Sequence, residues 1–333
     1  MSRVLSGVQP SGDLHLGNYL GAVRNWVADQ HEHDAFFCVV DLHALTTADH
    51  DPAVLAERTL QAAGSLLAAG LDPEVCTLFA QSHVPQHPRL TWLLECVAGY
   101  GELRRMTQFK EKGADQENVR VGVFTYPVLM AADIVLYDAD RVPVGDDQRQ
   151  HLELTRDLAM RFNARYGPTF TVPDAAVPAV GARVMDLQEP TRKMSKSVSS
   201  PLGTILVLDP PEEIDRKVRK AVTDTDTAVR YDPAAKPGVS NLLELLAAAQ
   251  GGDPAQLAGA FDSYGGLKAA VTESLVELLR PVQARYAELH ADPGHVTAVL
   301  AAGAAKARSV AGPTLDRAME AMGLLVPPGG FSA

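Results

Sequence analysis

RVLSGVQPSGDLHLGNYLGAVRNWVA, residues 3–28, contains the pattern that decides the fold. Residues 3–8 have the length and apolar character of a strand, and residues 19–28 have the spacing of an amphipathic helix. A polar loop that contains glycine, residues 9–18, joins the two. This strand–loop–helix opening predicts the first unit of a parallel α/β sheet.

The same loop has the properties of a nucleotide cradle. Gly7, Gly12 and Gly17 permit a close approach of the backbone to a ligand, and the start of a helix offers free N–H groups. His15 and Asn18 would lie at the mouth of this cradle. The glycine spacing differs from the G-x-G-x-x-G dinucleotide pattern, so a mononucleotide is the better candidate. The alternative is an ordinary turn between a strand and a helix.

Strand-length and helix-length stretches alternate up to residue 200, and helical spacing dominates after Asp209. This order predicts an α/β protein with a Rossmann-like, parallel-sheet nucleotide-binding domain at residues 1–200 and an all-helical domain at residues 201–333. The last helix is a candidate for packing back on the first domain. Asp41-Leu42-His43 follow an apolar run and would lie at the carboxyl edge of the sheet, where ligands bind.

Asp133 stands in an unusually apolar stretch, TYPVLMAADIVLY at residues 125–137. A carboxylate is costly to bury without a hydrogen-bond donor, so Asp133 needs a protein, water or ligand partner. Tyr126 and Met130 precede it by seven and three residues, which places all three on one helical face. A hydrogen bond between helices and a ligand contact are equal alternatives on spacing alone.

Lys193-Met194-Ser195-Lys196-Ser197 has the character of a cationic loop. Lysine ammonium groups are mobile point charges, which suits the charge that develops on a departing pyrophosphate. A solvated turn of lysine and serine is the alternative. Lys112, in a basic segment that ends at a glycine, is a further candidate for reaching a triphosphate.

Two other charged segments allow two interpretations each. Gly145-Asp146-Asp147-Gln148 leads from an expected strand into a helix, so its carboxylates are either helix caps or acceptors for ribose and ammonium groups. Basic residues on a helix expected after Asp209 indicate either a surface that faces RNA or a solvated face; they are Arg216, Lys217, Arg219 and Lys220.

The composition excludes several classes of protein. A net charge of −11 argues against indiscriminate nucleic-acid binding, although a local basic face is compatible with it. No apolar run approaches the roughly 20 residues that span a bilayer, and the N-terminus lacks a signal-peptide pattern, so we expect a cytoplasmic protein without a membrane partner. Cys38, Cys76 and Cys96 form no C-x-x-C pair, so we expect reduced core cysteines and no structural metal.

HLGN at residues 15–18 and KMSKS at residues 193–197 form the paired signature of the class I aminoacyl-tRNA synthetases. Within that class, the chain closely resembles the bacterial tryptophanyl-tRNA synthetase family. The resemblance runs from about Ser6 to Leu325, through SGVQPSG at 6–12, GELRRMTQFKEK at 101–112, YPVLMAADI at 126–134, VPVGDDQRQHLELTRDLA at 142–159 and AVTDTDTAVRYD at 221–232.

The resemblance implies a homodimeric enzyme that uses ATP with Mg²⁺ to activate L-tryptophan and then transfers the tryptophan to tRNA(Trp), with the helical region at the anticodon. It implies catalytic roles for His15, Asn18, Lys112, Lys193 and Lys196. It implies ATP contacts for Gln9, Pro10, Ser11, Gly17, Asn18, Gly145, Asp146, Asp147, Val184, Lys193, Met194, Ser195, Lys196 and Ser197.

It also implies tryptophan contacts for Asp133, Tyr126, Met130, Gln148, His43 and Gly7. Asp133 would accept the indole N–H, which agrees with the interpretation of its apolar surroundings because an indole nitrogen is a donor only. Phenylalanine would leave Asp133 without that donor. A site matched to a polar group of its substrate discriminates by about 10⁴–10⁵ against an analogue that lacks the group, so no editing domain is expected.

Three rival functions are compatible with parts of the pattern. A tyrosyl-tRNA synthetase is disfavoured by the YPVLMAADI helix, and another nucleotidyltransferase by the complete KMSKS segment. The third is a paralogue that binds tryptophan, ATP or RNA for regulation or resistance without charging tRNA. The intact lysines of residues 193–197 argue against it, because a binding protein needs no loop for a leaving group.

Overall fold

The computed structural model describes residues 2–46, 52–112, 119–143, 148–176, 184–195 and 200–331. In these segments five strands form one parallel sheet with the order β3-β2-β1-β4-β5. The strands are β1 (Arg3–Val8), β2 (Asp34–Val39), β3 (Thr77–Ala80), β4 (Arg141–Pro143) and β5 (Asp174–Ala176). The chain moves outward from β1 to β3 on one side and then to β4 and β5 on the other, so the strand order reverses next to β1.

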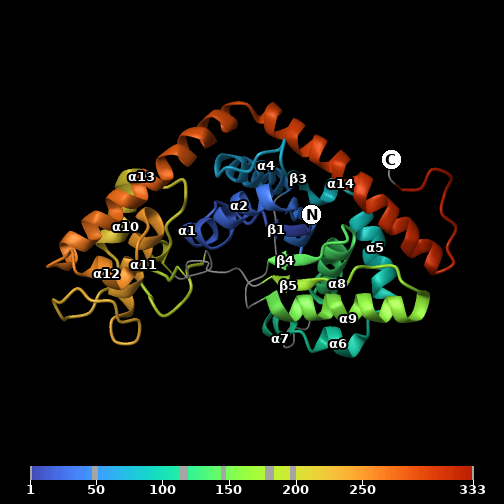
Figure 1. Cartoon of the computed structure of the whole chain (residues 1–333), viewed down its shortest axis with the longest axis horizontal. Coiled ribbons are helices and arrows are strands. Elements are labelled where there is room, and N and C mark those ends of the chain that lie inside the picture. The colour runs from blue at the N-terminus through green and yellow to red at the C-terminus, as the bar shows by residue number, and fades with distance from the viewer. Residues whose placement is uncertain are drawn as a thin grey trace.

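Helices cover both faces of this sheet (Figure 1). The helices within the first 200 residues are α1 (Leu16–Asn18), α2 (Arg24–Glu32), α3 (Asp41–Ala44), α4 (Pro52–Ala68), α5 (Gln86–Glu95), α6 (Tyr100–Arg104), α7 (Thr107–Lys112), α8 (Val121–Val135) and α9 (Arg149–Tyr166), with a π-helical turn η1 (Tyr19–Val23) and a 3₁₀ turn η2 (Gln81–His83). The α/β class and the parallel sheet are therefore confirmed.

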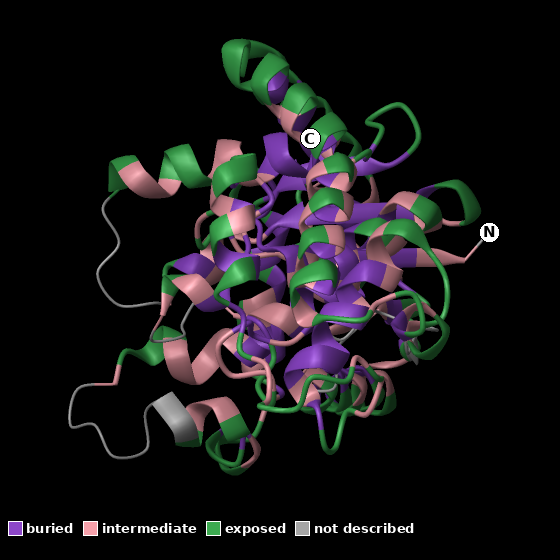
Figure 2. Cartoon of the chain, turned by 90° about the vertical axis from the view of Figure 1, so that its left-hand side faces the viewer, coloured by how far each residue is buried: buried purple, intermediate pink, exposed green. Residues whose placement is uncertain are grey.

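The side chains of β2 show why its sequence is a continuous apolar run. Phe37 and Val39 belong to one hydrophobic cluster, whereas Phe36 and Cys38 belong to another on the opposite face. A strand alternates its side chains between the two faces, so a strand that is covered on both faces is apolar throughout. Figure 2 shows the result, with buried residues gathered in the sheet and on the helix faces around it.

The chain beyond residue 200 is helical apart from its connections. After a 3₁₀ turn, η4 (Pro201–Gly203), it forms α10 (Pro211–Arg219), α11 (Pro237–Gln250), α12 (Pro254–Ala258), α13 (Tyr264–Ala291) and α14 (Pro293–Ala321). The last two form an arch over the rest of the molecule (Figure 1).

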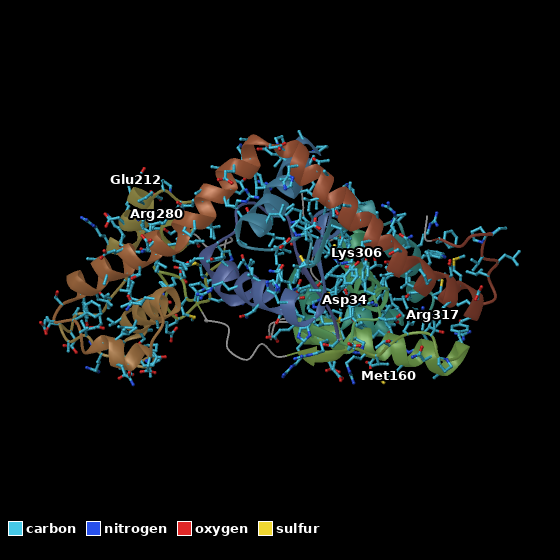
Figure 3. All side chains as sticks on the ribbon, turned by 45° about the horizontal axis from the view of Figure 1, so that its top comes forward. Asp34, Met160, Glu212, Arg280, Lys306 and Arg317 are labelled. Atoms are coloured by element: carbon cyan, nitrogen blue, oxygen red, sulfur yellow. The ribbon has the colours of Figure 1, made fainter. Side chains whose placement is uncertain are left out.

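Helix α14 packs against β3 and α5, so the end of the chain lies on the first part of the protein. Gly303 makes this approach possible, because a Cβ atom at that position would lie only 1.8 Å from the carbonyl oxygen of Leu78 in β3. Arg317 of α14, labelled in Figure 3, donates a hydrogen bond of 2.8 Å to Asp138. The exact boundary between two domains near residue 200 stays a prediction.

Two sequence expectations differ from the structure. Cys38 and Cys76 are buried, but Cys96 is exposed, so it is not a core residue. The basic residues of α10 carry partners of opposite charge: Arg216 and Arg219 pair with acidic residues of the same helix, and Lys217 is buried against Asp209 at 2.6 Å. Arg216 and Arg219 are exposed and paired within the helix, as on a solvated face, whereas the buried Lys217 fits neither a solvated face nor a surface for RNA.

Candidate active site

The loop after β1 leaves the sheet beside the point where the strand order reverses. In open parallel sheets, ligands bind at the carboxyl edge next to such a reversal. A pocket of about 210 Å³ lies here, walled on one side by the loop and on the other by α4. The predicted residues that line it are Gly7, Gln9, Ser11 and Asn18. The structure therefore brings the predicted nucleotide loop and an open cavity together.

His15 lies at the turn from this loop into α1. Its Nδ1 accepts a hydrogen bond of 3.2 Å from the backbone N–H of Asn18, so the imidazole is the N-cap of the helix. Gly17 packs closely against the same ring: a Cβ atom at this position would lie only 3.1 Å from ring atoms of His15. This cap holds His15 and Asn18 in a fixed relation.

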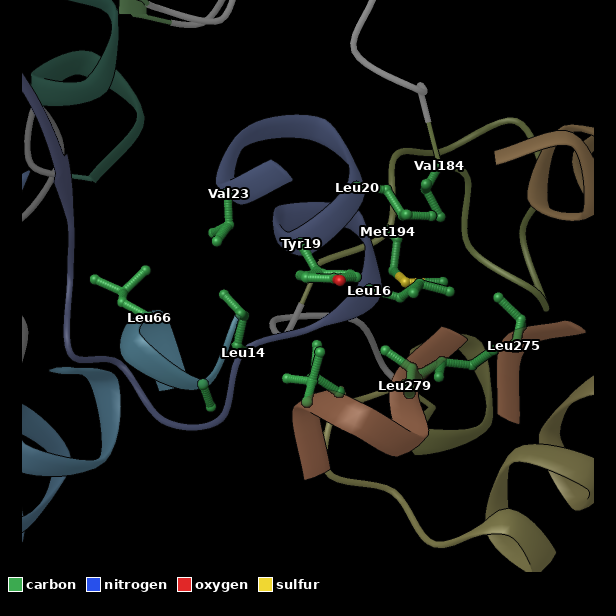
Figure 4. Packing of buried hydrophobic residues seen from close by; sticks show 14 of the residues in the cluster. Leu14, Leu16, Tyr19, Leu20, Val23, Leu66, Val184, Met194, Leu275 and Leu279 are labelled. Atoms are coloured by element: carbon green, nitrogen blue, oxygen red, sulfur yellow. The ribbon is translucent and has the colours of Figure 1, made fainter. Parts of the chain in front are cut away.

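The segment after the lysine loop pairs with the first loop, which brings the two signatures together. The N–H of Leu16 donates to the carbonyl of Ile205 and the N–H of Val207 donates to the carbonyl of Leu14, both at 2.8 Å. Figure 4 shows the buried side chains of the first loop and the helical turn after it: Leu14, Leu16, Tyr19 and Leu20. They pack near Val184, near Met194 of the lysine loop, and near α13. Sequence spacing alone did not predict this strand-like pairing.

Residues 184–195 form a hairpin-like segment that leads into the lysine loop. The backbone N–H of Met194 donates to the carbonyl of Val184 at 3.0 Å. The backbone N–H of Asp186 donates to the carbonyl of Arg192 at 2.8 Å. Val184 and Met194 bury their side chains in the core, so only their backbone is available for contact with a nucleotide. Lys193, the first residue of the lysine loop, is exposed and pairs with Met185 across this hairpin.

Helix α11 clamps this hairpin. The side chain of Asn241, which is buried, accepts a hydrogen bond from the N–H of Met185 and donates one to its carbonyl, both at 3.0 Å. The backbone N–H of Val222 also donates to the carbonyl of Leu187 at 2.8 Å. The lysine hairpin is therefore attached to the helical region as well as to the first loop.

Asp133 of α8 lies at the carboxyl edge of β2 and β3, and it has three side-chain partners. Gln81 Nε2 lies 2.8 and 2.9 Å from its two oxygens, His87 Nδ1 lies 2.6 Å from Oδ1, and His43 Nε2 lies 2.8 Å from Oδ2. Burial alone would raise the pKa of Asp133. The attraction of His87 and the hydrogen bonds from His43 and His87 outweigh it and hold this pKa well below its usual range.

Of the other residues predicted for the amino-acid pocket, His43 contacts this carboxylate directly and Tyr126 contacts His43. The rings of His43 and Tyr126 meet edge to face at 6.2 Å. Tyr126 Oη hydrogen-bonds to Gln108 Oε1 at 2.9 Å and to His151 Nε2 at 2.7 Å. Met130 is partly buried on the same helix, and Gln148 is the N-cap residue of α9. Gly7 fits closely under Val40, where a Cβ atom would be 2.9 Å from the valine side chain.

Some predicted residues lie outside the described residues, namely Gly145, Asp146, Asp147, Lys196 and Ser197, as does the side chain of Lys112. Pro10 and Ser195 lie in the described segments, and the carbonyl of Ser195 accepts a hydrogen bond of 2.9 Å from Thr204 Oγ1. Among the described residues, no cluster of three or more His, Cys, Asp or Glu side chains is arranged to hold a metal ion. None of the described helices is long and apolar enough to cross a membrane.

The sequence patterns gave no prediction for Gln81 and His87. Gln81 follows β3 directly, and Asp41 lies two residues after the end of β2, so the rule that polar groups after parallel strands meet at one edge applies to Gln81 too. His87 gives no such signal, because its contact with Asp133 joins residues 46 apart in the sequence.

The comparisons with known proteins agree with this geometry. The family model of class I tRNA synthetases for tryptophan and tyrosine (W and Y) matches residues 1–280. The chain belongs to this family. Tryptophan–tRNA ligase 1 of Streptomyces coelicolor is 59% identical over 332 residues, which cover 98% of each chain.

Solved structures of this class I family have the same fold over nearly their full length. Tryptophanyl-tRNA synthetase from Mycoplasma pneumoniae is 38% identical, with a TM-score of 0.90 and 98% of both chains covered. The enzyme from Campylobacter jejuni, solved with ADP and tryptophan, is 33% identical, with a TM-score of 0.84, and covers 97% of this chain and 100% of its own.

Proposed function

We propose that this class I synthetase is a tryptophan–tRNA ligase. It activates L-tryptophan with ATP to tryptophanyl-adenylate and pyrophosphate, and then transfers tryptophan to the 3′ end of tRNA(Trp). The observation that carries this choice is the buried acceptor Asp133, whose partner His43 accepts a hydrogen bond of 3.3 Å on its carbonyl from Gln9 of the nucleotide loop. Similarity over nearly the whole length to tryptophan–tRNA ligases supports it.

Positioning and charge stabilisation supply the catalysis. A carboxylate oxygen of tryptophan bonds to the α-phosphorus of ATP while the bond from that phosphorus to the pyrophosphate oxygen breaks, so no protein nucleophile or general base is needed. Lys193, Lys196 and Lys112 stabilise the departing phosphates, and His15 and Asn18 hold the triphosphate at the start of α1. Magnesium enters with ATP as part of the substrate complex.

ATP lies along the first loop and under the lysine loop. The residues assigned to it are Gln9, Pro10, Ser11, Gly17, Asn18, Gly145, Asp146, Asp147, Val184 and residues 193–197. The pocket next to α4 and the pairing of residues 14–16 with residues 205–207 support this placement. Tryptophan lies deeper, with its indole at Asp133 and with Gly7, His43, Tyr126, Met130 and Gln148 around it.

Helix α11 positions the lysine loop through Asn241. Replacing Asn241 by alanine should slow adenylate formation by about tenfold to a hundredfold, since a small displacement of reacting groups costs that much, while the KM for tryptophan stays within about threefold. Rapid-quench measurement of adenylate formation tests this expectation. Ser240→Ala is the matched control, because Ser240 is equally buried on the same helix but bonds to the N–H of Asp232. Equal rates in both variants would contradict the positioning role.

The active protein is a cytoplasmic homodimer, and an exposed apolar face supports the dimer. Trp92, Tyr100 and Val121 are 66%, 69% and 74% exposed, which is unusual for large apolar side chains without a partner. A groove of about 420 Å³ beside Trp92 is also lined by Tyr126 of the proposed tryptophan pocket. A second copy on this face would therefore lie next to the active site.

Replacing Trp92 by glutamate should convert the dimer to a monomer at micromolar concentration, because a charge would be buried in an apolar contact. Sedimentation velocity measures the change. Met160→Glu is the control, since Met160 is an exposed apolar residue on α9, outside the groove (Figure 3). Dimers in both variants would contradict the placement of the interface.

Charging of tRNA tests the function as a whole. Purified protein incubated with ATP, Mg²⁺, labelled tryptophan and tRNA(Trp) should produce tryptophanyl-tRNA. Charging of a tyrosine tRNA with tyrosine instead would place the chain with the tyrosine enzymes of its family. Binding of tryptophan and ATP without charging would show a regulatory paralogue.

A further inference from the structure

The hydrogen-bonding capacity of Asp133 is already filled within the protein. Its two oxygens receive four contacts of 2.6–2.9 Å, two from Gln81 and one each from His87 and His43. An ionised carboxylate has about four lone-pair sites. An indole N–H can therefore bind to Asp133 only if one of these donors leaves its place.

Gln81 and His87 each bond to Asp133 through one polar atom of the side chain and to a second protein group through the other. Each is fully buried. The Oε1 of Gln81 accepts the backbone N–H of Leu42 at 3.1 Å, which sets the orientation of its amide and points Nε2 at the carboxylate. The Nε2 of His87 hydrogen-bonds to Tyr137 Oη at 2.8 Å. Burial raises the pKa of Tyr137, so its hydroxyl keeps its proton and can donate to this nitrogen.

His43 differs from the other two donors in its position. Its side chain is 13% exposed, whereas that of His87 is 0% exposed. It follows β2 on the short helix α3, and its ring meets the edge of Tyr126, which lines an open groove. His43 is thus the donor to Asp133 that lies nearest to open space, and it is an aromatic N–H like the indole.

We propose that Gln81 and His87 are permanent donors to Asp133, and that His43 is an exchangeable donor whose hydrogen bond the indole N–H of tryptophan replaces. This inference rests on the proposed function of Asp133 as the indole acceptor. Gln81 and His87 then act as positioning residues that keep one oxygen of the carboxylate aimed at the pocket. In the absence of tryptophan, His43 donates a hydrogen bond to Asp133, so that the buried carboxylate keeps its hydrogen-bond donors before and after the substrate binds.

The replacement predicts a spectroscopic change in the unmodified protein. Full-length protein with ¹⁵N-labelled histidine is titrated with L-tryptophan, and the imidazole signals are assigned with His43→Leu and His87→Leu variants. Saturation should shift the His43 ring nitrogens and leave the Nδ1–H signal of His87 in place. The sulfur analogue of tryptophan, with benzothiophene in place of indole, should bind without moving His43. Movement of His87 instead, or an unmoved His43 with bound tryptophan, would overturn the inference.

Kinetics separate this inference from the proposed function. The preference of the enzyme for tryptophan over the sulfur analogue, as a ratio of kcat/KM values, should fall at least tenfold in His87→Leu and stay within about threefold in His43→Leu. A tenfold fall in His43→Leu with no change in His87→Leu would overturn the assignment of the two donors. An unchanged preference in Asp133→Asn would instead show that Asp133 is not the indole acceptor, and the proposed pocket would fail.

Discussion

Replacing Asp133 by asparagine should lower kcat/KM for tryptophan by about 10²-fold, because a hydrogen bond to a charged acceptor contributes about 1.5–3 kcal/mol. Asparagine keeps the shape of the side chain but places an N–H₂ group among donors that need an acceptor. The Asp133 side chain is 8% exposed, so little water can compensate for the loss. Steady-state exchange kinetics with varied tryptophan measure the effect.

The KM for ATP provides the internal control, since Asp133 does not line the pocket of the nucleotide loop. It should change less than threefold in the asparagine variant. A circular dichroism melt checks that the variant folds. A fully folded variant with the parent value of kcat/KM for tryptophan would exclude Asp133 from substrate recognition.

Replacing Lys196 by alanine should slow adenylate formation by about 10²–10³-fold, the usual cost of removing one donor that stabilises developing charge. Tryptophan binding should be nearly unchanged, because the lysine acts on the phosphates and not on the indole. Single-turnover measurement of adenylate formation gives the rate, and calorimetric titration with tryptophan gives the affinity. Lys193→Ala should show the same pattern.

Lys306→Ala is the matched control for the loss of one positive charge. Lys306, labelled in Figure 3, is exposed on α14, so its removal should leave the rate of adenylate formation within about twofold of the parent. A Lys196→Ala variant that forms adenylate at the parent rate would remove the lysine loop from the mechanism.

Local patterns in the sequence predicted the secondary structure around this site and one of its buried polar residues. The strand–loop–helix at residues 3–28 gave a strand, a loop and helical turns in the structure, and the loop does border a pocket. Asp133 was correctly expected to need a donor, because the cost of burying a carboxylate depends on its immediate apolar neighbours. The helix-length stretches beyond residue 210 correspond to α10, α11, α13 and α14.

Contacts between distant parts of the chain could not be predicted in this way. The donor His87, and the clamp from Asn241 to Met185 across 56 residues, depend on tertiary packing that leaves no periodic signal. The short edge strand β5 lies in a stretch rich in proline and glycine, residues that are uncommon inside strands. The first helix also begins irregularly, since Tyr19–Val23 form a π-helical turn.

Exchange of labelled pyrophosphate into ATP, with tryptophan, tyrosine and phenylalanine in parallel, is the most direct test of the central claim. It requires the nucleotide loop, the lysine loop and the Asp133 pocket at the same time. We expect exchange with tryptophan alone, because phenylalanine has no donor for Asp133 and the smaller ring of tyrosine has no indole N–H. Exchange with tyrosine, or no exchange despite tryptophan binding, would contradict this account.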